Sequence, residues 1–116
     1  MEYRVFRLTQ RISKDLKFDW TVEKMAELCE LSKEQFHKLF KQETGQSPIQ
    51  YLREQRLEKA KDLLEIRKSR IKEIIAEVGI HDQTHFVRDF KKAYGQTPNE
   101  YRQKHWDDIQ AKKDNG

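Results

Sequence analysis

Apolar positions recur along this chain at spacings of three and four residues, which is the period of an amphipathic helix. Near the N-terminus the pattern is carried by Val5, Leu8, Ile12 and Leu16. No stretch of six residues alternates apolar and polar side chains as a half-buried strand would. The pattern therefore predicts an all-α chain with its first helix near the N-terminus.

The segment of residues 36–51 is repeated fifty positions later, in residues 86–101. Seven positions are identical, and they include both prolines of the chain and two of its four glycines. Farther upstream, the apolar positions of residues 22–31 match those of residues 71–80 at an offset of 49. Identities at a fixed offset indicate an internal duplication, and the change of offset predicts a turn between the two matched stretches.

Each copy is predicted to form two helices joined by a short turn. In the first copy these helices cover about residues 21–30, with Thr21 as N-cap, and residues 32–44. Ser32, followed three residues later by Gln35, has the spacing of a capping box at the start of the second helix. Gly45 supplies the left-handed residue that ends that helix.

The second copy repeats the arrangement with helices over residues 71–78 and 82–94. We expect a turn at Gly79, an N-cap at Asp82 and a stop at Gly95. Two helices joined by a tight turn, the second with an exposed polar face, form the helix-turn-helix pattern.

A long helix is predicted between the copies, over residues 47–66. Pro48 suits its first turn, and its apolar stripe consists of Ile49, Leu52, Leu57, Ala60, Leu63 and Leu64. About 20 residues at 1.5 Å make a rod of roughly 30 Å. We therefore expect a helix-turn-helix subdomain over residues 1–46, a linker helix over residues 47–66 and a second subdomain over residues 67–116.

A further helix is predicted after Pro98, which brings the expected total to seven. Its last residues, from Ala111 to Gly116, are expected to fray.

Composition narrows the classes of protein that the chain can belong to. Of 116 residues, 38% are charged and 35% apolar, which indicates long solvated faces over a modest core. No apolar run approaches the roughly 20 residues that cross a bilayer, and residues 1–16 do not have the basic-then-apolar pattern of a signal peptide. The single Cys29 excludes an internal disulfide and fits a reducing compartment. We expect a cytoplasmic protein with no membrane association, and the net charge of +4 is a weak indication of a polyanionic partner.

The second helix of each copy has an exposed face whose chemistry suits the major groove of DNA. Arg and Lys donate to guanine, Glu accepts from cytosine and Val contacts the thymine methyl group. The candidate base-reading residues are Glu34, His37 and Lys38 in the first copy and Thr84, Val87 and Arg88 in the second. Lys41, Lys91 and Lys92 suit phosphates, flanked by Lys33, Gln83 and His85.

One such face alone is more typical of an ordinary solvated helix. Two equivalent faces joined by a rod of roughly 30 Å favour DNA, because one turn of the duplex is roughly 34 Å.

Other chemistry is poorly supported. Cys29 lies on an apolar stripe and is expected to act as a small buried hydrophobe. Trp20 and Trp106 are expected to pack in the core or to seal the subdomains. His81 and His85 have a spacing that zinc can use, but no third ligand follows at a fixed spacing. No glycine-rich phosphate loop or catalytic carboxylate pair is evident, so we expect no enzyme, cofactor or metal site.

Residues 26–64 and 70–102 resemble the DNA-binding domain of the AraC/XylS family, most specifically in the run FKKAYGQTPNEYR at residues 90–102. The resemblance extends over about residues 18–102. It implies two helix-turn-helix subdomains bridged by a long helix. The members of this family are bacterial transcription regulators, and most of them are activators.

Both recognition helices would read duplex promoter DNA, and RNA polymerase is an implied partner. The six candidate base-reading residues fall on matching positions of the family, while the helix starts near Thr21, Ser47 and Thr97, together with Ser32, match backbone contacts.

Three positions depart from the family pattern. Glu30 occupies a place where the family usually has a turn glycine, so we expect a left-handed residue there at a cost of about 1 kcal/mol. Ile75 replaces a common alanine and Ile80 replaces an aromatic residue, which changes the packing of the second copy.

Two forms of the regulator remain open. The chain is either the DNA-binding output domain of a longer AraC-type regulator or a stand-alone short activator, and the first is favoured. In either form this segment is expected to bind DNA as a monomer. A helical module that binds protein is the less favoured alternative.

Overall fold

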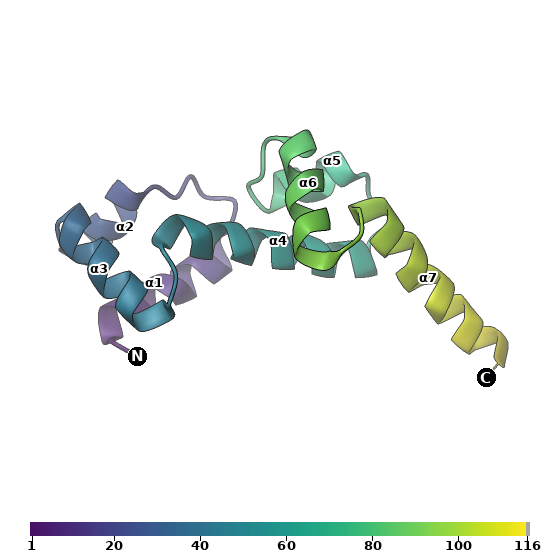
Figure 1. The fold of residues 1–116 in the computed structure, drawn as a ribbon, viewed down its shortest axis with the longest axis horizontal. Coiled ribbons are helices and arrows are strands. Elements are labelled where there is room, and N and C mark those ends of the chain that lie inside the picture. The colour runs from purple at the N-terminus through teal and green to yellow at the C-terminus, as the bar shows by residue number, and fades with distance from the viewer. Residues whose placement is uncertain (116) are drawn as a thin grey trace. The chain divides into compact units, whose positions relative to one another are not determined.

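The computed structural model describes residues 1–115 (Figure 1). Within them the chain forms seven helices and no strand, which confirms the all-α prediction. The helices are α1 (Tyr3–Lys14), α2 (Val22–Leu28), α3 (Lys33–Thr44), α4 (Pro48–Ile66), α5 (Ile71–Glu77), α6 (Gln83–Tyr94) and α7 (Pro98–Asn115). No helix of this part of the chain is long and apolar enough to cross a membrane.

The chain divides into two compact units within α4. The first unit comprises Met1–Arg56 and the second begins at Leu57. Leu52 of α4 packs in the core of the first unit, whereas Leu57 and Leu64 of the same helix pack in the core of the second. The predicted linker helix therefore supplies core residues to both units.

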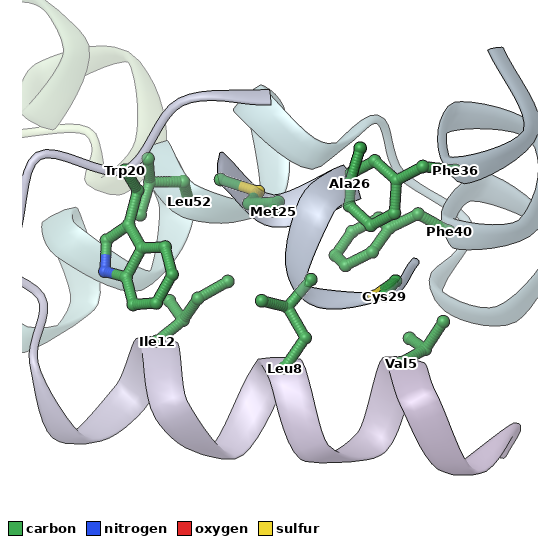
Figure 2. Packing of buried hydrophobic residues seen from close by; sticks show 10 residues of the cluster. All are labelled: Val5, Leu8, Ile12, Trp20, Met25, Ala26, Cys29, Phe36, Phe40 and Leu52. Atoms are coloured by element: carbon green, nitrogen blue, oxygen red, sulfur yellow. The ribbon is translucent and has the colours of Figure 1, made fainter. Parts of the chain in front are cut away.

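The core of the first unit joins α1, α2, α3 and the start of α4. Val5, Leu8 and Ile12 point from α1 toward the side chains of the other helices (Figure 2). The ring centroids of Phe36 and Phe40 lie 5.5 Å apart. The α1 stripe is confirmed up to Ile12, but α1 ends at Lys14, so the expectation that Leu16 belongs to this helix is wrong.

The segment after α1 is held by side-chain donors that bond to backbone carbonyls. Arg56 reaches from α4 and donates to the carbonyl oxygens of Leu16 (3.0 Å) and Phe18 (2.9 Å). The indole nitrogen of Trp20 donates to the carbonyl oxygen of Asp15 (2.8 Å). Trp20 is buried, as expected. These bonds close an irregular segment over the core, where unpaired carbonyls would be costly.

The second unit repeats the core of the first. The ring centroids of Phe86 and Phe90 lie 5.7 Å apart, close to the 5.5 Å between Phe36 and Phe40. Phe90 contacts Tyr101 in the way that Phe40 contacts Tyr51. The side chain of Tyr101 donates a hydrogen bond to Glu65 of α4. The duplication seen in the sequence is thus a duplication of packing.

The turns between paired helices use a left-handed residue in each copy. Gly79 has φ of 83° and Glu30 has φ of 57°, so the expected left-handed conformation of Glu30 is confirmed. The amide of Leu31 bonds back to the carbonyl of Ala26 (3.0 Å). This early reversal ends α2 at Leu28, two residues before the predicted end.

Two further expectations are wrong. Ile49 is 43% exposed, because Pro48 and Leu52 make the inward contacts one helical turn apart and Ile49 is rotated away from them.

Residues 111–115 are helical rather than frayed. Hydrogen bonds one turn apart support this solvated end of α7, from Gln103 to Asp107 (2.9 Å) and from Gln110 to Asp114 (3.1 Å). Gly116 lies outside the described residues.

Trp106 lies half-buried on α7, with the ammonium group of Lys68 at 5.2 Å from its ring centroid. Its half-burial fits the expected sealing position better than a fully enclosed core position.

Candidate nucleic-acid interface

The two candidate recognition helices, α3 and α6, have the same length and equivalent caps. The Ser32 hydroxyl accepts a hydrogen bond from the Gln35 amide (3.1 Å), and the Gln35 side chain accepts one from the Ser32 amide (3.2 Å). This is the predicted capping box. At the start of α6, the Asp82 carboxylate accepts from the amide of His85 (3.0 Å). Each helix is 12 residues long and ends at a left-handed glycine.

The polar face of α3 is fully available to a ligand. Phe36 and Phe40 are buried on the core side. The candidate contacts on the opposite side are all exposed, namely Glu34, His37, Lys38 and Lys41. None of these four side chains has an ion pair or hydrogen bond within the described residues. The core thus orients α3, and the four polar side chains are free for recognition.

The face of α6 differs from that of α3 in two respects. Thr84 and Arg88 are exposed, but Val87 is half-buried and packs against the second core. His85, a flanking candidate, lies with Nε2 at 3.4 Å from a carboxylate oxygen of Asp89. The candidate phosphate contacts Lys91 and Lys92 and the flanking Gln83 are exposed.

Lys33 is engaged with the preceding helix. Its ammonium nitrogen lies 3.4 Å from the Glu23 carboxylate on α2. A backbone hydrogen bond and Lys33 hold the pKa of Glu23 below its usual value. This pair links α2 to the start of α3, and no local pattern of residues predicts it.

The candidate backbone contacts at helix starts are all capping residues. The hydroxyls of Thr21, Ser47 and Thr97 accept hydrogen bonds from amides three residues ahead, at 3.1, 3.2 and 3.1 Å respectively. The helix amides at these starts give them partial positive charge, which favours phosphate.

The start of α7 contains an acidic group that sequence reasoning missed. Glu100 accepts a hydrogen bond from the amide of Thr97 (2.9 Å), completing a second capping box. This backbone bond lowers the pKa of Glu100. The T-x-x-E spacing in the sequence could have revealed it. The equivalent position in α4 is the neutral Gln50.

The competing chemical sites have no support in the geometry. Burial raises the pKa of the Cys29 thiol, and the residue is 2% exposed, so the expectation of a small buried hydrophobe is confirmed. Among the residues that the structure describes, no three His, Cys, Asp or Glu side chains are grouped to hold a metal ion.

Two capped helix-turn-helix units, each with an exposed second helix, define the class of helix-turn-helix DNA-binding proteins. The family described as a helix-turn-helix domain matches residues 25–104, more than half of the chain. The transcriptional activator RhaR of Yersinia pseudotuberculosis is 40% identical over 83 residues, which cover 69% of this chain and 29% of RhaR. The transcriptional regulator AlkR of Acinetobacter baylyi is 37% identical over 84 residues, which cover 72% of this chain and 28% of AlkR.

Solved structures agree with these relatives. The C-terminal domain of AraT, a response regulator from Geobacillus stearothermophilus, superposes with a TM-score of 0.81 at 38% identity, covering 89% of this chain and 86% of that domain. This chain belongs to the AraC/XylS family of transcription regulators and is a DNA-binding domain of that family. It spans less than a third of the length of RhaR and AlkR.

Proposed function

We propose that the chain reads a specific duplex with α3 and α6 in successive major grooves and thereby activates transcription in bacteria. The observation that carries this proposal is the equivalence of the two helices, which share length, caps and core phenylalanines and expose polar faces. A helix whose polar face only contacts solvent does not need an equivalent helix in a second copy. Two equivalent helices suit a DNA site in which each helix reads a different major groove.

The base-reading role is assigned to Glu34, His37 and Lys38 on α3 and to Thr84, Val87 and Arg88 on α6. Arg88 suits guanine and Glu34 suits cytosine. Val87 is half-buried, so only the part of its side chain that remains exposed is available to a thymine methyl group.

The phosphate-contacting role is assigned to Lys41, Lys91 and Lys92, with contributions from Ser32, Lys33, Gln83 and His85. The helix starts at Thr21, Ser47 and Thr97 add backbone amides. Phosphate contacts set affinity and position but do not discriminate sequence.

The chain is proposed to be the output domain of a longer cytoplasmic regulator that contacts RNA polymerase and binds DNA as a monomer through this segment. The greater length of RhaR and AlkR supports this form over a stand-alone activator. The reading frame of the gene distinguishes the two forms.

Selection of bound duplexes from a random pool tests the reading of DNA. We expect enrichment of one asymmetric motif with two conserved blocks, one for each recognition helix. A bound pool that remains random after repeated rounds contradicts sequence-specific recognition.

A further inference from the structure

The helix α1 carries a row of cations that the DNA-binding role does not use. Arg4, Arg7, Arg11 and Lys14 recur every three or four residues, all are exposed, and α1 contains no acidic residue. At this spacing the four side chains follow one side of the helix. The row runs beside the buried stripe of Val5, Leu8 and Ile12, so it borders the contact with α2.

A groove of about 280 Å³ lies along this row, between α1 and the end of α2. Three arginines, Arg4, Arg7 and Arg11, line it together with Tyr3 and Leu28, and no carboxylate does. Through Arg11 and Leu28 it continues into a wider hollow of about 920 Å³ that Phe18 and Trp20 border. Three carboxylates also line this wider part, those of Asp15, Glu27 and Glu30, so the net positive charge is confined to the narrow part. We call the two together the α1–α2 groove.

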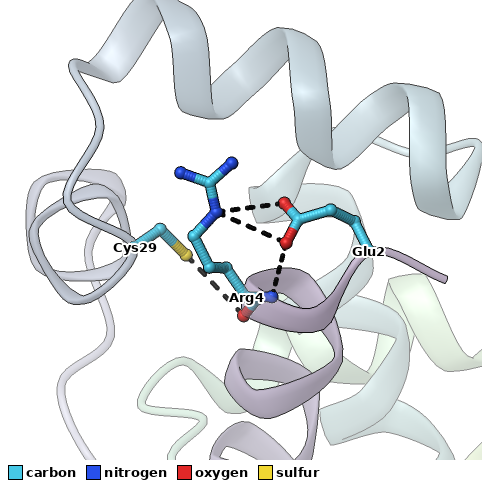
Figure 3. A network of polar contacts seen from close by, with 3 residues as sticks. All are labelled: Glu2, Arg4 and Cys29. Carbon is cyan, nitrogen blue, oxygen red and sulfur yellow. Dashed lines mark hydrogen bonds and ion pairs between the residues drawn. The ribbon is translucent and has the colours of Figure 1, made fainter.

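The three arginines in the narrow part of the α1–α2 groove retain free donors. Arg4 Nε bonds to the Glu2 carboxylate at 3.2 and 3.3 Å, while its terminal nitrogens have no partner (Figure 3). The Arg7 guanidinium lies 5.7 Å from the ring centroid of Tyr3. Arg11 has no ion pair within the described part of the chain. The narrow part of the groove is therefore positive and rich in donors.

The same groove exposes large apolar side chains. Leu28 is 47% exposed, Tyr3 68% and Phe18 42%. Arginines mixed with exposed aromatic and aliphatic side chains are typical of protein interfaces. None of the candidate DNA contacts lines either part of the groove. The groove is therefore a second surface of the first unit, distinct from the exposed face of α3.

We propose that the α1–α2 groove docks an acidic amphipathic helix of a partner protein. Carboxylates of that helix bond to Arg7 and Arg11, and its apolar side chains cover Leu28 and Tyr3. The absence of lining carboxylates in the narrow part selects an acidic partner, and the exposed apolar side chains select a helix with one apolar face. The phosphate backbone of a duplex offers anions to the arginines but no extended apolar face that would cover Leu28 and Tyr3.

A designed peptide tests the docking directly. The probe is a 14-residue helix with leucines on one face and glutamates flanking them, added to the ¹⁵N-labelled chain. We expect amide shifts confined to α1 and α2. Replacing the glutamates of the peptide by glutamine should weaken binding at least tenfold. No shift at millimolar peptide, or shifts centred on α3 and α6, overturns the proposal.

Variants identify the groove as the site. Arg7→Ala combined with Arg11→Ala, both exposed, should weaken peptide binding at least tenfold, and Leu28→Glu should do the same independently. Lys41→Ala is the matched control, since it removes a cation from α3 and should leave peptide binding unchanged. Equal peptide binding by the wild type and by both groove variants contradicts the assignment.

A random 16-bp duplex separates protein docking from DNA binding. The double arginine variant should bind the duplex as the wild type does, while Lys41→Ala binds it more weakly. Loss of duplex binding in the arginine variant makes the groove a DNA surface and overturns the proposal. A wild type that binds peptide but no duplex contradicts the proposed DNA-binding function and leaves the docking site intact.

Discussion

At the scale of single residues, the two copies solve the same backbone problem with different residues. Glu30 and Gly79 both occupy the left-handed region at the reversal after the first helix of their copy. The amides that follow, of Leu31 and Ile80, bond back at 3.0 and 2.8 Å. A side chain in this region costs about 1 kcal/mol, which only the first copy bears.

Replacing Glu30 by glycine should therefore stabilise the first unit. We expect the free energy of unfolding to rise by up to about 1 kcal/mol, reduced by the greater freedom of glycine in the unfolded chain. Urea denaturation measures it. Gly79→Ala is the matched control and should lower stability. A loss of stability in Glu30→Gly would show that the Glu30 side chain is stabilising.

Replacing Arg88 and replacing Lys41 should have different effects on DNA binding. Arg88→Ala should reduce discrimination at particular bases by about 1–3 kcal/mol, because it removes a donor to a base edge. Lys41→Ala should weaken binding to all sequences alike, because it removes a phosphate contact. Competition binding with the selected site and its single-base variants measures both. Equal losses on specific and random duplexes for Arg88→Ala contradict its base-reading role.

Tyr101 should make the stability of the second unit depend on alkaline pH. Burial and the hydrogen bond to Glu65 raise the pKa of Tyr101 to about 12, whereas an unfolded tyrosine titrates near a pKa of about 10. The unfolded state thus loses this proton first, and stability should fall between about pH 10 and pH 12. Denaturation across this range should show a steeper fall in the wild type than in Tyr101→Phe. Identical slopes contradict the assignment.

At the scale of elements, short local motifs carried most of the predictive power. The capping box at Ser32, the N-cap at Asp82 and the glycine stops depend on residues within one turn, so the sequence predicts α3 and α6 closely. The misplaced Ile49 shows the limit, because two inward neighbours decided its orientation.

Contacts between distant segments had no such local signal. Arg56 bonds to Leu16 and Phe18, about 40 positions away, and only the folded chain brings them together. The α1–α2 groove escaped prediction for the same reason. The candidate site was predictable as an exposed face, but the half-burial of Val87 and the Lys33–Glu23 pair depend on tertiary packing.

The starts of α4 and α7 should bind phosphate unequally. Glu100 places a carboxylate at the start of α7 and already takes the Thr97 amide, whereas α4 has Gln50 there. Glu100→Gln should therefore strengthen binding to a random duplex about two- to fivefold, because it removes a negative charge from a helix start that favours phosphate. Gln50→Glu is the reciprocal variant and should weaken it. Unchanged affinity in both variants removes these helix starts from the interface. Fluorescence anisotropy at low salt provides the measurement.

At the scale of the whole molecule, two units with separate cores share one continuous helix, α4. Each unit presents one recognition helix with its own lysines. Binding energy should therefore come from two sets of phosphate contacts.

The salt dependence of the binding constant should report the number of those phosphate contacts. The logarithm of the binding constant should fall linearly with the logarithm of salt concentration, and each neutralised phosphate should add about 0.9 to the slope. Lys41→Ala and Lys91→Ala should each reduce the slope by about 1, and the double variant by about 2. Titration of a duplex at several salt concentrations measures this. A flat line for the wild type contradicts DNA binding.

The free polar face of α3 has an evolutionary consequence. Glu34, His37 and Lys38 are exposed and have no hydrogen bond or ion pair within the described residues, while the caps and phenylalanines that hold α3 lie elsewhere on the helix. Mutations at these three positions should leave folding intact, so under the proposed base-reading roles the preferred target of the first unit can change by single steps. Under the same proposal Val87 couples target preference to packing in the second unit, and its half of the target should change more slowly.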